Sequence, residues 1–254
     1  MPTASNGGSP IIDYKIYWDN GVGNGNFDTV LASTTYPSLE YTASGLTEGT
    51  YYSFKITAVN IVDESLKSTS GRFLASDLPG IPGTPVKVSA DANQITISWT
   101  APSSDGGSDL LLYHVYIDGV KHEDITTPTT TYTFSTPTTG QLYAFTVSSS
   151  NYINEGSQST SVSIIAATVP EASTSAPTKV SASSSHIEVN WLAPADGGSI
   201  IMGYLVYVDG VSSASLVTQA SVTTLSISNS VVSLTSGQDY SISVAAYNAV
   251  GIGA

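Results

Sequence analysis

Residues 95–117 read ITISWTAPSSDGGSDLLLYHVYI. In the first five positions apolar and polar side chains alternate, so that Ile95, Ile97 and Trp99 share one face of an extended chain. Such alternation is typical of a strand with one buried face. A second apolar run, from residue 110 to residue 117, follows a Gly-Gly-Ser loop and predicts another strand. The apolar faces of such strands are buried where two sheets pack face to face, so the stretch predicts a β-sandwich.

The Gly-Gly-Ser loop and the run behind it occur three times, at residues 7–17, 106–116 and 197–207. The copies start roughly 90 to 100 residues apart, which is a common size for a β-sandwich domain. The strand that carries Trp99 also has a counterpart, residues 187–191, before the third loop. The chain therefore contains internal repeats.

A second motif lies downstream of the loop in each copy. It begins with a turn that contains Gly, continues with Tyr, and then alternates strictly until it ends in Asn. The three copies are residues 46–60, 137–151 and 234–248. A turn followed by period-two alternation predicts a further strand with one buried face.

The order of these elements resembles the fibronectin type III family over nearly the whole chain. In that family the Trp lies on strand B, the first Tyr lies on strand C, and the later Tyr opens strand F. The resemblance implies that this later residue is a tyrosine corner, whose hydroxyl forms a hydrogen bond with the preceding turn. By position the corner residues are Tyr52, Tyr143 and Tyr240.

The resemblance also implies the domain organisation: all-β, with tandem immunoglobulin-like sandwiches of about 90 residues arranged as an extended rod. Residues 1–78 are predicted to be a truncated repeat that starts at strand C and has no strands A and B. Residues 79–169 are predicted to be a complete repeat, and residues 170–254 a repeat that lacks strand G. The Pro-containing segments 78–85 and 169–177 are predicted to be stiff linkers.

Composition excludes several classes of function. The 254 residues include 7 basic and 20 acidic ones, which gives a net charge of −13, and no cysteine. Nucleic acid and anionic membranes attract clustered Lys and Arg, and such a cluster does not occur here. The absence of cysteine excludes disulfides, zinc–thiolate sites and cysteine nucleophiles. No apolar run reaches the roughly 18 residues of a membrane span, so we expect no membrane insertion by this segment.

No catalytic, cofactor-binding or metal-binding residues are predicted, and the chain is not expected to be an enzyme. No nucleophile–base grouping or closely spaced metal motif occurs in the sequence. The three histidines are interpreted as surface residues, with His114 on strand C, His122 in a loop and His186 ahead of strand B.

The loop at residues 19–28 allows two interpretations. Asp19, Asn24, Asn26 and Asp28 are possible oxygen ligands for calcium, but the loop has no closing Glu of the kind that an EF-hand supplies. A hairpin rich in Gly and Asn explains the same residues.

A tyrosine recurs on the outward face of strand C, at Tyr17, Tyr116 and Tyr207. These residues either pack across a solvated sheet or form a stripe that contacts a partner. Packing is the favoured interpretation.

The predicted function is that of a non-catalytic structural or adhesive segment in an extracellular or cell-surface assembly, such as a filament. The alternatives are accessory spacers of a secreted glycan-degrading enzyme and a receptor ectodomain. The predicted partners are proteins, through head-to-tail self-association or through continuation in a longer repeat array. The Ser/Thr-rich linkers are candidates for O-linked glycans. Because a fold does not fix a function, these expectations rest on the resemblance.

Overall fold

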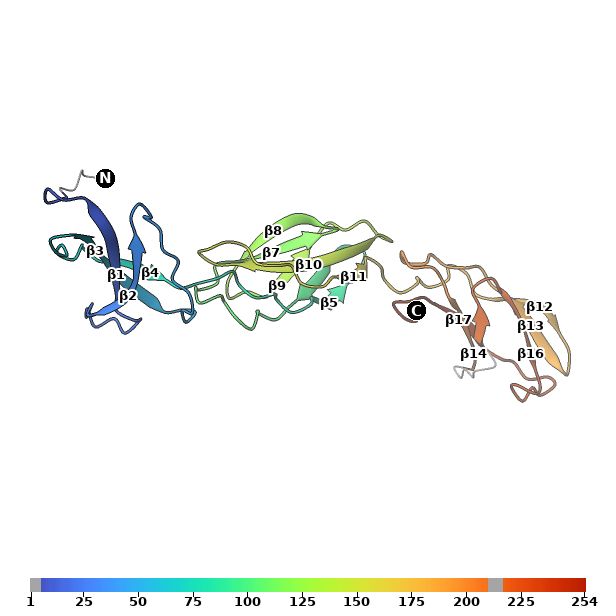
Figure 1. Cartoon of the computed structure of the whole chain (residues 1–254). Helices are drawn as coiled ribbons and strands as arrows, with labels where there is room; N and C mark the ends of the chain where they lie inside the picture. Colours follow the sequence, from blue (N-terminus) through green and yellow to red (C-terminus); the bar gives the residue numbers. More distant parts are fainter. Residues whose placement is uncertain (1–5, 210–216) are drawn as a thin grey trace.

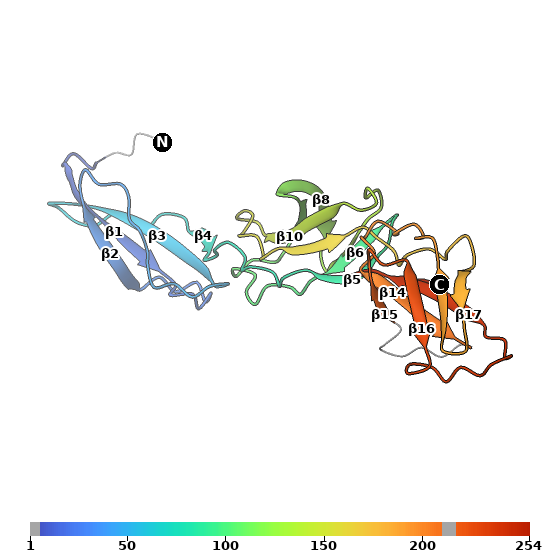
Figure 2. The same cartoon turned by 90° about the vertical axis from the view of Figure 1, so that its right-hand side faces the viewer.

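The computed structural model describes residues 6–209 and 217–254, and all regular secondary structure in these ranges is β-strand. No helix in these ranges has the length and apolar character that crossing a bilayer requires. The strands follow one another as three groups along an elongated molecule (Figures 1 and 2). We call β1–β4 the first repeat, β5–β11 the second and β12–β17 the third.

The second repeat is a sandwich of two antiparallel sheets. One has the strand order β5-β6-β9 and the other β11-β10-β7-β8. The strands are β5 (Val86–Ala90), β6 (Ile95–Ser98), β7 (Leu112–Ile117), β8 (Val120–Thr126), β9 (Thr131–Phe134), β10 (Leu142–Ser150) and β11 (Val162–Ile165). The predicted β-sandwich is confirmed here.

The core of this repeat lies between the two sheets and consists of the alternate residues that the sequence pattern selects. Ile95 and Ile97 of β6 are fully buried, and Trp99 just beyond it is 5% exposed. The Trp99 ring meets the Tyr113 ring edge to face, with centroids 5.5 Å apart. The predicted inward face of strand B is therefore confirmed.

The third repeat has the same two layers, with the strand orders β12-β13-β16 and β15-β14-β17. Its strands are β12 (Thr178–Ala182), β13 (His186–Asn190), β14 (Gly203–Val208), β15 (Val217–Gln219), β16 (Thr224–Ser228) and β17 (Ile242–Tyr247). Trp191 and Tyr204 repeat the edge-to-face contact, with centroids 5.4 Å apart. In the described residues, β17 pairs with β14 on one side and has only the isolated bridge Tyr247–Ile252 besides.

The first repeat, as far as the structure describes it, is one sheet with the order β2-β1-β3-β4. Its strands are β1 (Ile11–Trp18), β2 (Thr29–Thr35), β3 (Tyr51–Asn60) and β4 (Gly71–Leu74). Ile56 is 49% exposed, whereas its counterpart in the second repeat, Val147, is fully buried. The difference arises because, in the described residues, the first repeat has no second sheet over this face, where the second repeat has β5, β6 and β9. The domain boundaries at 78/79 and 169/170 stay a prediction.

The tyrosine corner forms in all three repeats and joins the turn before strand F to that strand. The hydroxyl of Tyr143 accepts a hydrogen bond from the Thr138 backbone N–H at 2.8 Å. The same bond runs from Thr47 to Tyr52 at 2.9 Å and from Thr235 to Tyr240 at 2.6 Å. The corner bond implied by the resemblance is confirmed, with the phenol oxygen as acceptor.

Candidate functional site

The structure corrects the interpretation of the histidines. His114 is 5% exposed, and its Nδ1 atom lies within hydrogen-bond distance of the Asp124 carboxylate. His122 belongs to β8 rather than to a loop, and its Nδ1 atom lies 2.8 Å from the Tyr132 hydroxyl. His186 is the first residue of β13 rather than a residue ahead of it. The surface interpretation is therefore wrong for His114, which is buried and lies beside the carboxylate of Asp124 on the neighbouring strand.

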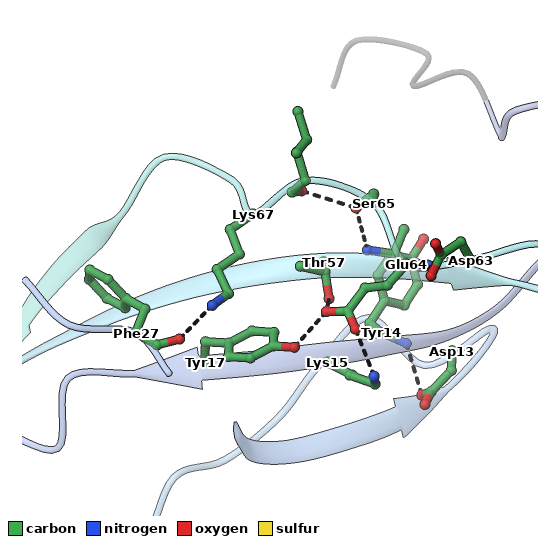
Figure 3. Close-up of polar contacts among 12 residues, drawn as sticks. Asp13, Tyr14, Lys15, Tyr17, Phe27, Thr57, Asp63, Glu64, Ser65 and Lys67 are labelled. Atoms are coloured by element: carbon green, nitrogen blue, oxygen red, sulfur yellow. Dashed lines mark hydrogen bonds and ion pairs between the residues drawn. The ribbon is translucent and has the colours of Figure 1, made fainter. Parts of the chain in front are cut away.

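A carboxylate with three donors lies on the outward face of the first repeat (Figure 3). Glu64 accepts hydrogen bonds from Tyr17 Oη at 2.6 Å, Thr57 Oγ1 at 2.7 Å and Lys15 Nζ at 2.7 Å. The bonds from Lys15, Tyr17 and Thr57 favour the ionised form and lower the pKa of Glu64 from 4.5 to about 2. A carboxylate so fully engaged is a poor general base, and the cluster instead joins the loop after β3 to strands β1 and β3.

The second repeat keeps part of this arrangement. Glu155 accepts hydrogen bonds from the hydroxyls of Tyr116 and Ser148. Burial alone would raise the pKa of Glu155, but these two bonds and the nearby positive groups lower it overall. In the third repeat the positions of Lys15 and Glu64 are taken by Leu205 and Ile252.

These contacts decide between the two interpretations of the outward tyrosines in the first two repeats. Tyr17 is 8% exposed, and the ammonium of Lys67 lies over its ring at 4.1 Å. The hydroxyl groups of Tyr17 and Tyr116 each donate a hydrogen bond to a glutamate of the same repeat. The packing interpretation is confirmed for these two residues. Glu64 and Glu155 are not among the residues predicted from the sequence, although each lies four positions after the Asn that ends strand F.

Replacing Glu64 by Gln is expected to make the first repeat less sensitive to acid. The lowered pKa means that Glu64 stabilises the fold fully above about pH 4.5, and that this contribution is lost as the pH falls toward 2. The urea midpoint of the first repeat, followed through NMR signals of β1 and β3, should therefore be higher in wild type than in E64Q at pH 7. The two midpoints should converge as the pH falls from 4.5 to 2. The matched control is Glu40→Gln, whose side chain is exposed. A gap between E64Q and wild type that is constant with pH would contradict the assignment.

Three of the four candidate ligands in the loop at residues 19–28 accept hydrogen bonds from backbone N–H groups. The carboxylate of Asp19 accepts from the backbone N–H groups of Gly21 at 3.1 Å and Ser53 at 3.0 Å. Asn24 and Asn26 accept from the N–H groups two positions on, both at 2.9 Å. These turns account for the residues as a hairpin. Among the described residues, no group of three or more His, Asp or Glu side chains has an arrangement that could hold a metal ion.

The contacts between successive repeats are the strongest candidate for a functional site. We call the contact between the first and second repeats the first joint, and that between the second and third repeats the second joint. At the first joint the connecting segment bonds to the loop that precedes β7. The N–H of Asp77 donates to Gly106 O at 2.8 Å, and the N–H of Gly80 donates to Ser104 O at 2.9 Å. The predicted linker 78–85 and the residue before it are thus held against the following repeat.

A buried asparagine fastens the first joint. Asn151, at the end of strand F, is 5% exposed. Its Nδ2 atom donates to Asp77 O and to Asp105 O, each at 2.8 Å. Its Oδ1 atom accepts from the backbone N–H groups of Ile153 and Asn154. One side chain therefore connects the linker, the Gly-Gly-Ser loop and the loop after strand F.

The second joint is built in the same way. Asn248 is 5% exposed, and its Nδ2 atom donates to Thr168 O and Asp196 O, each at 2.8 Å. The Thr168 N–H donates to Gly197 O at 2.8 Å, as Asp77 does to Gly106. The recurrence of the Asn is visible in the sequence, but its role requires the neighbouring repeat.

Glycines allow the two repeats of each joint to approach backbone to backbone. A Cβ atom on Gly107 would lie 2.2 Å from the backbone N of Gly49 in the preceding repeat. At the second joint, a Cβ atom on Gly198 would lie 2.9 Å from the N of Gly140. Side chains at these positions would separate the repeats, so the Gly-Gly-Ser loops are contact surfaces as well as turns.

The family model described as fibronectin type III domain matches residues 2–71, 81–165 and 175–254. Fibronectin type-III domain-containing protein 3A of Mus musculus is 26% identical over 83% of this chain and 18% of its own length. Myomesin-2 of Homo sapiens is 28% identical over 84% of the chain and 16% of its own length. Endoglucanase B of Cellulomonas fimi is 35% identical over 42% of the chain and 11% of its own length.

The chain thus spans less than a fifth of the length of these relatives. Among solved structures, the FN1-FN3 domains of chicken CNTN1 align with 98% of this chain and 88% of their own, at 18% identity and a TM-score of 0.41.

Proposed function

Because the chain belongs to the fibronectin type III domain family, we propose that it acts as a non-catalytic structural segment that holds other parts of an assembly at a fixed distance and angle. Domains of this family are generally non-catalytic and are common in extracellular and cell-surface proteins. The proposed location is accordingly extracellular or at the cell surface, and adhesion and filament formation belong to the same proposal.

The observation that carries the proposal is the repeated construction of the joints. Flexible tandem domains have few contacts across a polar linker. Here each joint has a buried amide, a backbone ladder along the linker and a close contact between glycines. Two successive joints with the same bonds support a rod with a set geometry (Figures 1 and 2).

The rigidity can be measured by the distance between spin labels on two repeats. The chain contains no cysteine, so Ser33→Cys in β2 and Thr131→Cys in β9 give unique labels on exposed positions. We expect one narrow distance distribution by double electron–electron resonance. Gly107→Ala should broaden or displace it, because the added methyl group meets the backbone of Gly49.

The matched control is Gly119→Ala. Gly107 and Gly119 both have a positive φ, 73° and 79°, but a Cβ atom on Gly119 would meet nothing within 4 Å. The control variant therefore carries the same backbone strain without the contact and should keep the narrow distribution. A broad distribution in the unmodified chain would show independent repeats and overturn the proposal.

A second candidate is a spacer within a secreted glycan-degrading enzyme. It is favoured by the similarity to Endoglucanase B and to Exoglucanase B of Cellulomonas fimi, the latter 28% identical over 81% of the chain. The two candidates share the fixed-distance role and differ in what the rod connects. A catalytic domain encoded in the same reading frame would favour the second.

A further inference from the structure

The first repeat carries an open groove at the end that faces away from the first joint. It has a volume of about 290 Å³ and lies between the Gly-Gly-Ser loop and the loop after β3. Its lining includes Asn6, Ile11, Asn60, Val62 and Ser65. The corresponding grooves of the second and third repeats are the places where the joints form.

In both joints the groove that corresponds to this one is filled by the same kind of segment. At the first joint it is residues 77–80, and the carbonyl oxygen of Pro79 lies so close to Gly156 that a Cβ atom there would be 2.4 Å from it. At the second joint Pro170 O has the same relation to Gly253, at 2.3 Å. Each segment has an apolar residue directly before the proline, Leu78 or Val169.

The first repeat has the same side-chain amide that binds such a segment in the joints. Asn60 Nδ2 donates to Asn6 O at 3.0 Å, as Asn151 does to Asp105 O. Asn60 Oδ1 accepts from Val62 N and Asp63 N, so the amide is held in the orientation that it has in the joints. In the joints the equivalent Nδ2 atoms, of Asn151 and Asn248, donate a second hydrogen bond to a backbone carbonyl of the incoming segment.

We propose that this groove is a docking site for the extended apolar-Pro segment that leads out of another fibronectin type III repeat of this kind. The proposal rests on the proposed function as a rod and names the kind of segment that this groove would bind. The segment contributes its backbone carbonyl to Asn60 and its apolar-Pro pair to the groove. Side-chain charge is not needed for recognition, because the bonds at both joints involve the segment's backbone.

One residue sets this groove apart from the other two. Ser65 stands where Gly156 and Gly253 lie against the linker proline. A Cβ atom at this position forces the segment outward by comparison with the joints. We therefore expect weaker docking than in the joints, and an increase when the Cβ atom is removed.

A peptide with blocked ends and the sequence of residues 75–81, ASDLPGI, is the probe. It is titrated into the full ¹⁵N-labelled chain. We expect saturable shifts of the Asn60 side-chain amide and of the backbone signals of Ala58 and Ser65. Asn60→Ala should weaken binding about fivefold, the usual effect of one lost hydrogen bond. Ser65→Gly should strengthen it by a similar factor, and Asn26→Ala, at an exposed loop position, should leave it unchanged.

The outcomes separate this inference from the proposed function. A narrow spin-label distribution together with an absence of shifts at the groove would overturn the docking site and leave the rod intact. Equal binding by wild type, N60A and S65G would also overturn it, because the peptide would then bind elsewhere. If N60A fails to fold, the S65G variant tests the proposal alone. Peptide binding to S65G that is unchanged or weaker than binding to wild type would contradict the docking site.

Discussion

Replacing Trp99 by alanine is expected to lower the free energy of unfolding of the second repeat by about 3–5 kcal/mol. The side chain is 5% exposed and packs edge to face on Tyr113 between the two sheets. Its removal leaves a cavity lined by the buried residues of β6, β7 and β10, which cannot collapse into it without breaking their strand pairing. The loss is a large fraction of the roughly 5–15 kcal/mol by which a typical domain is stable.

The measurement must be specific to one repeat, because three domains in one chain do not unfold as a single two-state unit. Hydrogen exchange of the backbone amides of β7 and β10 reports on the second repeat alone. The matched control is Tyr152→Ala, an aromatic residue of the same repeat that is 76% exposed. The control should change the unfolding free energy by about 0.5 kcal/mol or less. A loss below about 1 kcal/mol in W99A would contradict the core assignment.

Replacing Asn151 by alanine is expected to cost about 2–3 kcal/mol locally and to open the first joint. The variant removes the two Nδ2 bonds to Asp77 O and Asp105 O and leaves both carbonyl groups without that donor. The N–H groups of Ile153 and Asn154 lose their acceptor as well. Because Asn151 is buried, water does not replace these bonds without rearrangement.

The amides of Asp77 and Gly80 are the appropriate probes, since both donate across the joint. We expect their hydrogen-exchange protection to fall about thirtyfold or more in N151A, the factor that corresponds to the lower energy above. The control is Asn154→Ala in the same loop, where an exposed Asn accepts one local bond, from Glu155 N. If Asp77 and Gly80 stay as protected in N151A as in N154A, the amide does not hold the joint together.

Most of the fold could be predicted because its signals are local. The alternation in residues 95–99 selects the buried face of β6, since successive side chains of a strand point to opposite sides. The recurrence of Gly-Gly-Ser, Tyr and Asn shows that the chain repeats one unit. The histidines show the limit of such reasoning: His114 lies on an outward position of β7, yet Asp124 of β8 is beside it and it is buried.

The candidate sites depend on strand pairing that composition does not reveal. Tyr17 and Glu64 are 47 positions apart, and the loop after β3 brings them to 2.6 Å. Asn151 and Asp77 are 74 positions apart and belong to different sides of a joint. A pattern of side chains within one segment contains no information about which segment of the next repeat will lie against it.

The sequence by itself therefore determined the class of fold, the presence of three repeats and the inward faces of the central strands. It could do so because a period-two pattern is a property of one extended segment and a recurring motif is visible along the chain. Only the tertiary structure decided what Glu64 binds, why His114 is buried and how Asn151 and Asn248 fasten the repeats together. The physical reason is that a hydrogen bond requires its two groups to be placed within a few tenths of an ångström and at a suitable angle. That placement is set by the packing of whole sheets and by the path of the linker, and not by the spacing of residues along the chain.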